Sequence, residues 1–397
     1  MNFPKAATPA GGNGDLGRGR MALLVVSIFA AAGSIHYQTP MLAAMGAEFG
    51  ADAASVGWVA TLTFSGFLVG TLFLVPLGDR LDKRGLILGQ FTVLIVALLA
   101  TAAAPSLGLL VAAGFVTGIC TAAGQLIIPM VAELAPPKER GRALGTVLSA
   151  LFLGVLFARV AGGFVASHIG WRWMYVFAAF MLITIAPVLF MRLPSLPPKT
   201  RLGYGALMRS LIELLHAHVE LRRAAAVQFL LGISYGGFWA TIAPMLLLLH
   251  HLGPTEAGLM GIPGAAGILV ARPAGRWMDR HGVAPVVRTG VSLVLAAFVV
   301  FAFAGWWIGA VIGGAILLDC GLRSAMVANQ TLVSTLDPDA RSRSNTVFSG
   351  SVWGGNAAGA FLASTALTHS GWLAVCAIAV TASVIALLVQ HRPAQRG

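Results

Sequence analysis

Five ionisable side chains interrupt long apolar stretches of this sequence and are the first candidates for chemistry. Asp319 and Arg323 are four residues apart, so on a helix they would share one face. His36, Arg159 and Arg272 stand singly in three other apolar stretches. The carboxylate of Asp319 can bind and release a proton, and the imidazole of His36 is a second candidate because it titrates near neutral pH. The alternatives are a permanent Asp319–Arg323 ion pair and a structural hydrogen bond for His36.

The elements that hold these residues are expected to be membrane helices. Of 397 residues, 57% are hydrophobic and 10% are charged, whereas a soluble surface needs about a quarter of its residues charged. This composition excludes a soluble enzyme. The apolar residues form twelve stretches of about 20 residues, the length of a helix that crosses a bilayer. We expect spans at 21–45, 54–77, 86–104, 108–131, 143–166, 173–191, 225–249, 258–278, 287–304, 307–331, 344–367 and 372–390.

The placement of the basic residues predicts the orientation of the chain. The sequence has 26 Lys and Arg residues against 14 Asp and Glu residues. With the amino terminus in the cytoplasm, nearly all of the basic residues fall in cytoplasmic segments, and the outer loops hold only Arg172. This positive-inside pattern predicts a bacterial inner-membrane protein with both termini in the cytoplasm. The net charge of +12 is therefore a topology signal and indicates no nucleic-acid partner.

The chain divides into two similar halves. We expect a disordered cytoplasmic tail at 1–20, a six-helix bundle at 21–191, a cytoplasmic loop with an amphipathic helix at 192–224, a second six-helix bundle at 225–390 and a cytoplasmic tail at 391–397. Parallel repeats of six helices are one plan of secondary transporters, with the solute site near the midplane. Short sequences recur at an offset of about 200 residues: Asp79-Arg80 matches Asp279-Arg280, Cys120 matches Cys320, and Pro40-Met41-Leu42 recurs as Pro244-Met245-Leu246.

These features resemble the major facilitator superfamily over nearly the whole chain. The family's loop motif, Gly-x-x-x-Asp-Arg-x-Gly-Arg-Arg, resembles Val75-Pro-Leu-Gly78-Asp79-Arg80-Leu81-Asp82-Lys83-Arg84, which has Val75 and Asp82 in place of the two glycines. The second copy, from Gly275 to Gly282, keeps both glycines. The resemblance implies an all-α membrane protein with twelve transmembrane helices in two pseudo-symmetric six-helix bundles, working by alternating access. It also implies that these loops gate the transport path, through Asp79, Arg80, Lys83, Arg84, Gly275, Asp279 and Arg280.

Three further stretches carry the resemblance. The fifth span resembles the family's antiporter motif, but Ala158-Arg159 replaces its Gly-Pro pair. The tenth span and the stretch from His36 to Pro40 resemble a bacterial branch of presumed efflux permeases. In the family's fold, spans 1, 4, 7 and 10 line the central cavity. The resemblance places Arg159, Gly162, Gly163 and Arg272 on helices between the bundles. It implies a proton-coupling and substrate cavity formed by His36, Tyr37, Gln38, Tyr235, Trp239, Asp319, Arg323, Asn329 and Gln330.

We expect a secondary active transporter of a small organic solute, with proton-coupled export by antiport favoured over proton-linked uptake by symport. The sequence contains no nucleotide-binding motif that fits its context, so the proton gradient is the expected driving force. Two remote alternatives are an intramembrane hydrolase that uses Ser234 and a non-transporting sensor or scaffold. The expected partners are the solute, protons and the lipid bilayer. We expect no cofactor and no metal ion, and a monomer.

Overall fold

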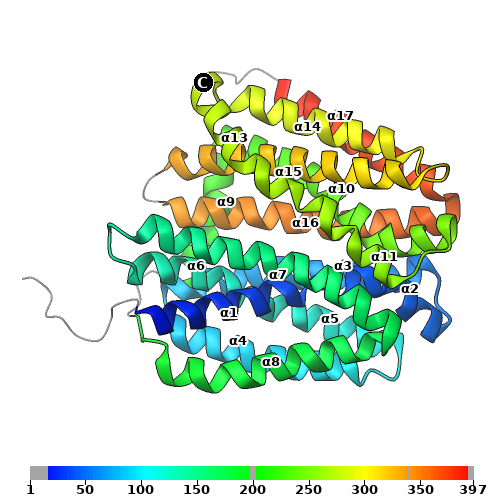
Figure 1. Ribbon diagram of the computed structural model, residues 1–397. Helices are drawn as coiled ribbons and strands as arrows, with labels where there is room; N and C mark the ends of the chain where they lie inside the picture. The colour runs from blue at the N-terminus through cyan, green and yellow to red at the C-terminus, as the bar shows by residue number, and fades with distance from the viewer. Residues whose placement is uncertain (1–16, 197–202, 338–339, 392–397) are drawn as a thin grey trace, which may run out of the picture.

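The computed structural model describes residues 17–196, 203–337 and 340–391, which form long helices that run side by side (Figure 1). The predicted tails lie mostly outside the described residues, and helix α1 already begins at Arg18. The start of α1 and the end of α17 lie at the same end of the bundle, on the left in Figure 1. We call this end the termini side and the opposite end the far side.

Six helical spans form the first half of the chain, and three of them are interrupted. The bounds are α1 (Arg18–Ser34) with α2 (Gln38–Phe49), α3 (Ala53–Val69) with η1 (Gly70–Leu74) and η2 (Pro76–Asp79), α4 (Lys83–Ala102), α5 (Leu107–Thr121) with α6 (Ala123–Leu134), α7 (Arg140–His168) and α8 (Trp171–Arg192).

Six more spans form the second half. The bounds are α10 (Val219–His250), the interrupted span of α11 (Pro254–Leu259), α12 (Gly261–Gly264) and α13 (Ala266–His281), then α14 (Val283–Phe301), α15 (Ile308–Leu336), α16 (Arg341–Ser370) and α17 (Trp372–His391). Helix α9 (Tyr204–Ala217) lies in the connection between the halves. Its apolar face, with Leu211 and Leu214 buried, packs against α10 and α16 on the termini side.

The break between α1 and α2 follows from Pro40. A proline inside a helix has no N–H to give to the carbonyl four residues earlier, and its ring clashes with that carbonyl. The residue four positions before Pro40 is His36, and the helix is interrupted at Ile35–Tyr37 with a bend of 41°. The His36 carbonyl accepts a hydrogen bond from Thr39 Oγ1 at 2.9 Å instead. The proline thus places His36 at a break in the middle of the first span.

The composition of the helices agrees with a membrane-spanning chain. Within the described residues, ten helical segments are long and apolar enough to cross a membrane, and the bent pair α1–α2 supplies an eleventh. The remaining predicted span, 344–367, falls within α16, a helix of 30 residues that is too polar to qualify. Its polar residues Ser344, Asn356 and Ser364 are buried because α16 packs between α10 and α3. A helix shielded by other helices can carry polar groups that join it to them.

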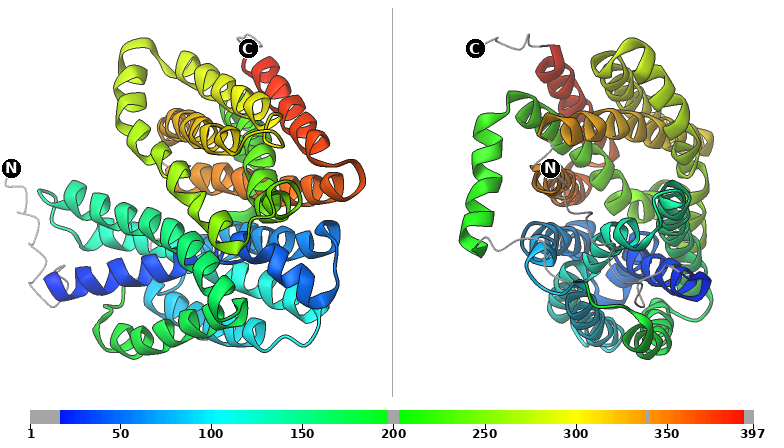
Figure 2. Two further views of the ribbon diagram at one scale, coloured as in Figure 1. Left: turned by 45° about the vertical axis from the view of Figure 1, so that its right-hand side comes forward. Right: turned by 90° about the vertical axis from the view of Figure 1, so that its left-hand side faces the viewer.

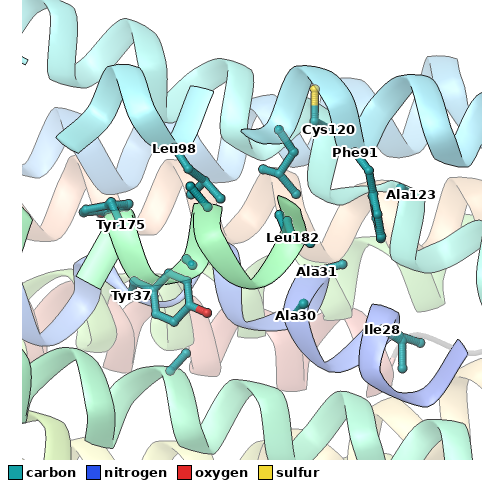
Figure 3. Packing of buried hydrophobic residues seen from close by; sticks show 14 of the residues in the cluster. Ile28, Ala30, Ala31, Tyr37, Phe91, Leu98, Cys120, Ala123, Tyr175 and Leu182 are labelled. Carbon is teal, nitrogen blue, oxygen red and sulfur yellow. The ribbon is translucent and has the colours of Figure 1, made fainter. Parts of the chain in front are cut away.

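Each half has its own apolar core. In the first half, Phe91, Leu98 and Leu182 belong to a buried cluster that joins α1, α4, α5 and α8 (Figure 3). In the second half, the rings of Phe238 and Phe301 stack with centroids 4.5 Å apart within a separate cluster. The apolar interior is therefore divided between two bodies, and the interface between them carries most of the buried charge described below.

Helices α7 and α11 bring the two halves into close contact at the far side. Gly163 of α7 lies against Pro254 and Gly258 of α11, so close that a β-carbon on Gly163 would collide with the α11 backbone. Ser167 Oγ accepts a hydrogen bond from the backbone amide of Thr255 at 3.1 Å. Glycine is needed here because the two helix backbones touch. These contacts close the far side on this flank.

The other flank is closed by α3 and α16. At the far side, Thr368 Oγ1 accepts a hydrogen bond from the Ala54 amide at 2.8 Å, and Gly57 packs directly against Ser364. The contact continues toward the termini side, where Gly350 of α16 packs against η1. This pair of helices therefore stays together along its whole length.

Helices α7 and α13, by contrast, separate toward the termini side. The face of α7 that carries Arg159 and Gly163 continues at helical spacing to Gly145 and Gly141. A β-carbon at Gly141 or Gly145, or at Gly275 of α13, would meet no atom within 4 Å. The left view of Figure 2 shows the halves converging at one end and diverging at the other. The described conformation is closed at the far side and opens toward the termini side.

We predict that Gly163→Leu forces the halves apart at the far side, because the added side chain has no space against Pro254. Cysteines at Ser167 and Thr255, which are adjacent in this conformation, report the separation. Disulfide formation between them in membranes should fall about fivefold or more, since close glycine contacts tolerate no added volume. The control is Gly89→Leu on an exposed face of α4, where a β-carbon meets no neighbour. Equal cross-linking in both variants would contradict the prediction.

Candidate functional site

Ionisable and aromatic side chains gather between the halves, midway along the spans. Arg159 lies over the ring of Trp239, and the Asp319 carboxyl group lies beside the same ring, 4.0 Å from Arg323. We call the following six residues the central cluster: His36 at the α1–α2 break, Arg159 of α7, Tyr235 and Trp239 of α10, and Asp319 and Arg323 of α15.

Arg159 reaches from the first half into the second. Its guanidinium lies over the ring of Trp239, 3.4 Å from the ring centroid, and its Nη2 donates a hydrogen bond to the Tyr235 hydroxyl at 3.0 Å. A desolvated cation over an indole ring contributes about 2 kcal/mol. The absence of side chains at Gly258 and Gly261 lets α11 and α12 approach the Arg159 backbone and side chain. Arg159 thus joins the halves by a polar contact beside the glycine contact.

Asp319 is 2% exposed and is only partly compensated. Its Oδ1 lies 4.0 Å from Arg323 Nε, a distance that permits attraction but no hydrogen bond. Its Oδ2 has no hydrogen-bond partner. A β-carbon at Gly264 would lie 2.9 Å from Oδ2 and 3.3 Å from Cζ2 of Trp239, so this glycine leaves the carboxyl group room beside the indole. A buried carboxyl group with a free oxygen is costly unless a proton or another donor completes it.

Arg323 and His36 complete the cluster and are themselves incompletely bonded. The Arg323 guanidinium lies over the ring of Phe152 of α7, 4.8 Å from its centroid, and its Nε has no hydrogen-bond partner. His36 is buried between Phe64 of α3 and Trp353 of α16, with ring centroids 6.5 and 6.4 Å away, and its Nδ1 is also unpartnered. Nothing in the local sequence around Phe152 and Trp353 distinguishes them from packing residues.

Four of the predicted cavity residues lie outside the cluster. Tyr37 points into the first-half core, where its ring packs edge-on against Tyr175 at 6.3 Å (Figure 3). Gln38 and Asn329 are buried, each with a side-chain nitrogen that has no partner, and neither forms a hydrogen bond to the cluster. Gln330 lies on the Asp319 face of α15, nearer the termini side.

The four predicted inter-bundle residues also divide. Arg159 and Gly163 lie between the halves as described above. Gly162 instead packs within the first half, where a β-carbon on this residue would lie 3.1 Å from the Tyr37 carbonyl oxygen. Arg272 is exposed on α13 and makes no hydrogen bond or ion pair with another described residue. The reason is the divergence of α7 and α13, which leaves the face of α13 near Arg272 without a partner helix.

Asp79 connects the halves at the termini side. Its Oδ2 accepts a hydrogen bond from Ser342 Oγ at 3.4 Å, in the first turn of α16. A carboxylate at this position also meets the positive end of the helix dipole. Its repeat partner, Asp279, is exposed and has no polar contact with another described residue. The two copies of the motif therefore differ in this conformation.

The basic residues of the first loop bind within their own half. Lys83 Nζ pairs with Glu133 of α6 at 2.7 Å and is almost fully buried. Arg84 Nη2 donates to the Phe190 carbonyl at 2.5 Å. These contacts fix the start of α4 against α6 and α8. Among the described residues, the side chains of Arg80 and Arg280 have no hydrogen-bond or ion-pair partner, and Gly275 lies within α13 with no neighbour beside it.

A polar face of α15 leads from the central cluster to the termini side. Arg323, Gln330 and Ser334 follow Asp319 at helical spacing on one face. Beyond Arg323 the face borders a cavity of about 430 Å³ that is lined by Val327, Gln330, Thr331, Ser334, Thr335 and Arg341. Arg341 Nε donates to the Ser334 carbonyl at 2.9 Å, which holds its guanidinium at this cavity. The cluster and the cavity lie along one side of one helix.

Long apolar helices, two internally similar halves and a charged cluster between them define a multi-pass membrane transporter. The sequence profile of the Major Facilitator Superfamily matches residues 24–225 and again 224–396, and the chain belongs to this family. The predicted family and fold class are thereby confirmed, and the chain is a transporter rather than an enzyme. Ser234, the residue of the hydrolase alternative, is buried and donates a hydrogen bond to the Ala379 carbonyl at 3.3 Å.

The relatives are named as transporters. The chain is 31% identical to "Uncharacterized transporter YgaY" of Escherichia coli O157:H7, over 96% of this chain and 97% of that protein. It is 33% identical to "Probable transporter SCO4007" of Streptomyces coelicolor, over 95% and 88%. It is 25% identical to "Multidrug resistance protein B homolog" of Mycobacterium tuberculosis, over 81% and 71%. The solved structure of a bacterial homologue of the lysosomal transporter Spinster shares the fold, with a TM-score of 0.72 at 15% identity over 93% and 94%.

We predict that Tyr235→Phe destabilises the protein by about 1.5–3 kcal/mol, because it leaves a buried guanidinium nitrogen of Arg159 without its acceptor. Thermal unfolding of the purified protein in detergent measures the change. The matched control is Tyr204→Phe, which removes an exposed hydroxyl bonded to the Phe73 carbonyl and should shift the midpoint much less. Similar shifts in the two variants would show that the Arg159–Tyr235 contact contributes little.

Proposed function

We propose that the chain is a proton-coupled secondary transporter of a small organic solute and that Asp319 carries the proton. The observation that supports this proposal is the state of the Asp319 carboxyl group: it is buried, its Oδ2 has no partner, and Arg323 is 4.0 Å away rather than hydrogen-bonded. Burial favours the neutral form of a carboxyl group, while a nearby cation favours the ionised form. A balance of opposed effects is what a group that loads and unloads a proton requires.

Alternating access is the proposed mode of movement. The far side is closed by glycine contacts between α7 and α11, while α7 and α13 diverge at the termini side. Rocking of the halves would open the first contact and close the second, and it would draw Arg159 away from Tyr235 and Trp239. In the described conformation the central cluster is largely buried, and the polar face of α15 extends from it toward the termini side, where the halves diverge.

The orientation and setting follow the sequence-based expectation. We propose that the protein lies in a bacterial inner membrane with both termini in the cytoplasm, because the loops on the termini side carry nearly all of the basic residues. It would act as a monomer, with the solute, protons and lipid as its partners. On this orientation, the termini side is the cytoplasmic side.

Two directions of transport are candidates. Export by proton antiport, the direction that the sequence favours, is supported by a relative named as a multidrug resistance protein. Proton-linked uptake by symport is supported by the charges of the central cluster, which has two arginines for one carboxylate. An excess of positive charge suits an anionic solute that binds together with a proton. Opposite responses of solute flux to an imposed pH gradient distinguish the two.

We predict that Asp319→Asn abolishes the response of solute flux to a pH gradient in proteoliposomes, because the amide cannot carry a proton. The solute is first identified by a panel of solutes and toxins on cells lacking or overproducing the protein. Solute exchange without a gradient should stay within about threefold of the parent, since the isosteric amide preserves the packing. Asp52→Asn is the control, because asparagine can still cap α3. A variant at Asp319 that retains full coupling would disprove this role.

A further inference from the structure

We infer that the solute is an organic monoanion, a carboxylate or similar acid with a flat apolar body, and that Arg323 binds its charge in the central cluster. This inference rests on the proposed function, since it names the solute class of the same site. It is carried by the charge balance of the cluster, by its unpartnered donors and aromatic walls, and by a cavity on the same face of α15.

The buried charges do not balance. Among the described residues, the charged groups of the central cluster are Arg159, Arg323 and Asp319, two cations and one anion. The neighbouring helices α12 and α16 add no charged group at this depth, and Arg272 of α13 is exposed. Arg288 of α14, near the level of Arg323, is a further cation and adds no negative charge. An uncompensated buried charge is costly, often by several kcal/mol. One additional negative charge would make the cluster neutral, whereas a cationic solute would raise the imbalance.

The donors that an acid needs are present and unused. The Nε atoms of Arg159 and Arg323 have no hydrogen-bond partner, and neither has Nε1 of Trp239. Arg159 is held by Tyr235 and Trp239, but Arg323 forms no hydrogen bond and is only attracted to Asp319 at 4.0 Å. A guanidinium binds a carboxylate through two parallel hydrogen bonds. Arg323 is therefore the group free to bind the solute's charge.

The apolar part of the solute would meet ring faces. Phe152 of α7 lies beneath Arg323, and Trp239 of α10 lies beneath Arg159. Across the interface, Trp353 packs against Phe67 with centroids 4.3 Å apart, beside His36. Ligand sites are mostly apolar walls with a few polar groups that fix orientation. Aromatic walls on both halves suit a flat ring system.

The cavity on the same face of α15 has the same charge preference. The cavity on the termini side is lined by amide and hydroxyl groups and by Arg341, and its six lining residues include no acid. Arg323 and Arg341 thus stand at the inner and outer ends of one polar face of α15. Clefts lined by one sign of charge concentrate ligands of the opposite sign.

An anionic solute determines how the proton is coupled. The solute and the ionised Asp319 would compete for Arg323, so protonation of Asp319 frees Arg323 for the solute. The proton and the anion then bind together, which favours the symport candidate over antiport. The other titratable groups near Asp319 are His36, Tyr235 and Cys320.

The experiment measures binding to the purified full-length protein in detergent, without any pH gradient. The probes are benzoate, 2-naphthoate and indole-3-acetate, each with its uncharged amide and its amine counterpart. At about pH 6, at least one acid should bind about tenfold or more tightly than its amide and amine, because a buried arginine then gains a charged partner. Binding should weaken when the pH rises to about 8. Acids that bind no better than their amides, or amines that bind best, would overturn the inference.

Variants assign the effect to the residues. Arg323→Gln should weaken binding of the acid about tenfold or more and leave binding of the amide unchanged. Arg323→Lys should restore only part of the loss, because lysine keeps the positive charge but lacks the two-pronged donor. Asp319→Asn should keep tight binding but lose its pH dependence. Arg288→Gln on α14, whose Nε contacts only its own helix, is the control. Thermal unfolding of each variant verifies folding. Since this assay measures binding alone, its failure would leave the proton-coupling test above unaffected.

Discussion

The structure depends on the cost of placing charge in the middle of a membrane protein. An ionisable group there costs about 2.5–3.5 kcal/mol on the insertion scale, so isolated charges are rare. This chain places three such groups at one depth, Arg159, Asp319 and Arg323, on helices of both halves. Asp319 offsets part of the cost of the two arginines, and the aromatic faces of Trp239 and Phe152 receive the guanidiniums. The charges can only be tolerated where the two halves meet, so their burial requires the interface.

The same interface must also be able to open, and the glycines show how both requirements are met. At the far side, Gly163 and Gly258 let α7 and α11 touch through their backbones. Toward the termini side, Gly141 and Gly145 continue the same face of α7 without a neighbour. A smooth surface that can pack at either end presents no interlocking side chains to disengage. Arg159 stands between these two stretches, which makes its contact with Tyr235 the polar part of an otherwise smooth joint.

Much of this architecture could be predicted from the sequence, because it follows from local rules. Apolar length located all twelve spans, including α16, whose polar residues are hidden by α3 and α10. Pro40 marks the break at which His36 lies, but the bend itself is seen only in the structure. The partners of Arg159 could not be predicted, because helical spacing relates residues of one helix and gives no relation between α7 and α10. For the same reason the sequence does not show that Tyr37, adjacent to His36, packs into the core, or that Arg272 has no partner helix.

Incomplete compensation is what separates the central cluster from a structural ion pair. Lys83 and Glu133 show the structural case, a buried ammonium 2.7 Å from its carboxylate. Asp319 and Arg323 stay 4.0 Å apart, with Oδ2 and Nε unpartnered. A fully bonded pair would resist both a proton and a solute, since either would have to break it. A ligand shifts a two-state equilibrium only by its differential affinity for the two states. Groups left unpaired in one conformation provide that difference, because a proton or a solute that bonds to them stabilises the conformation in which they are unpaired.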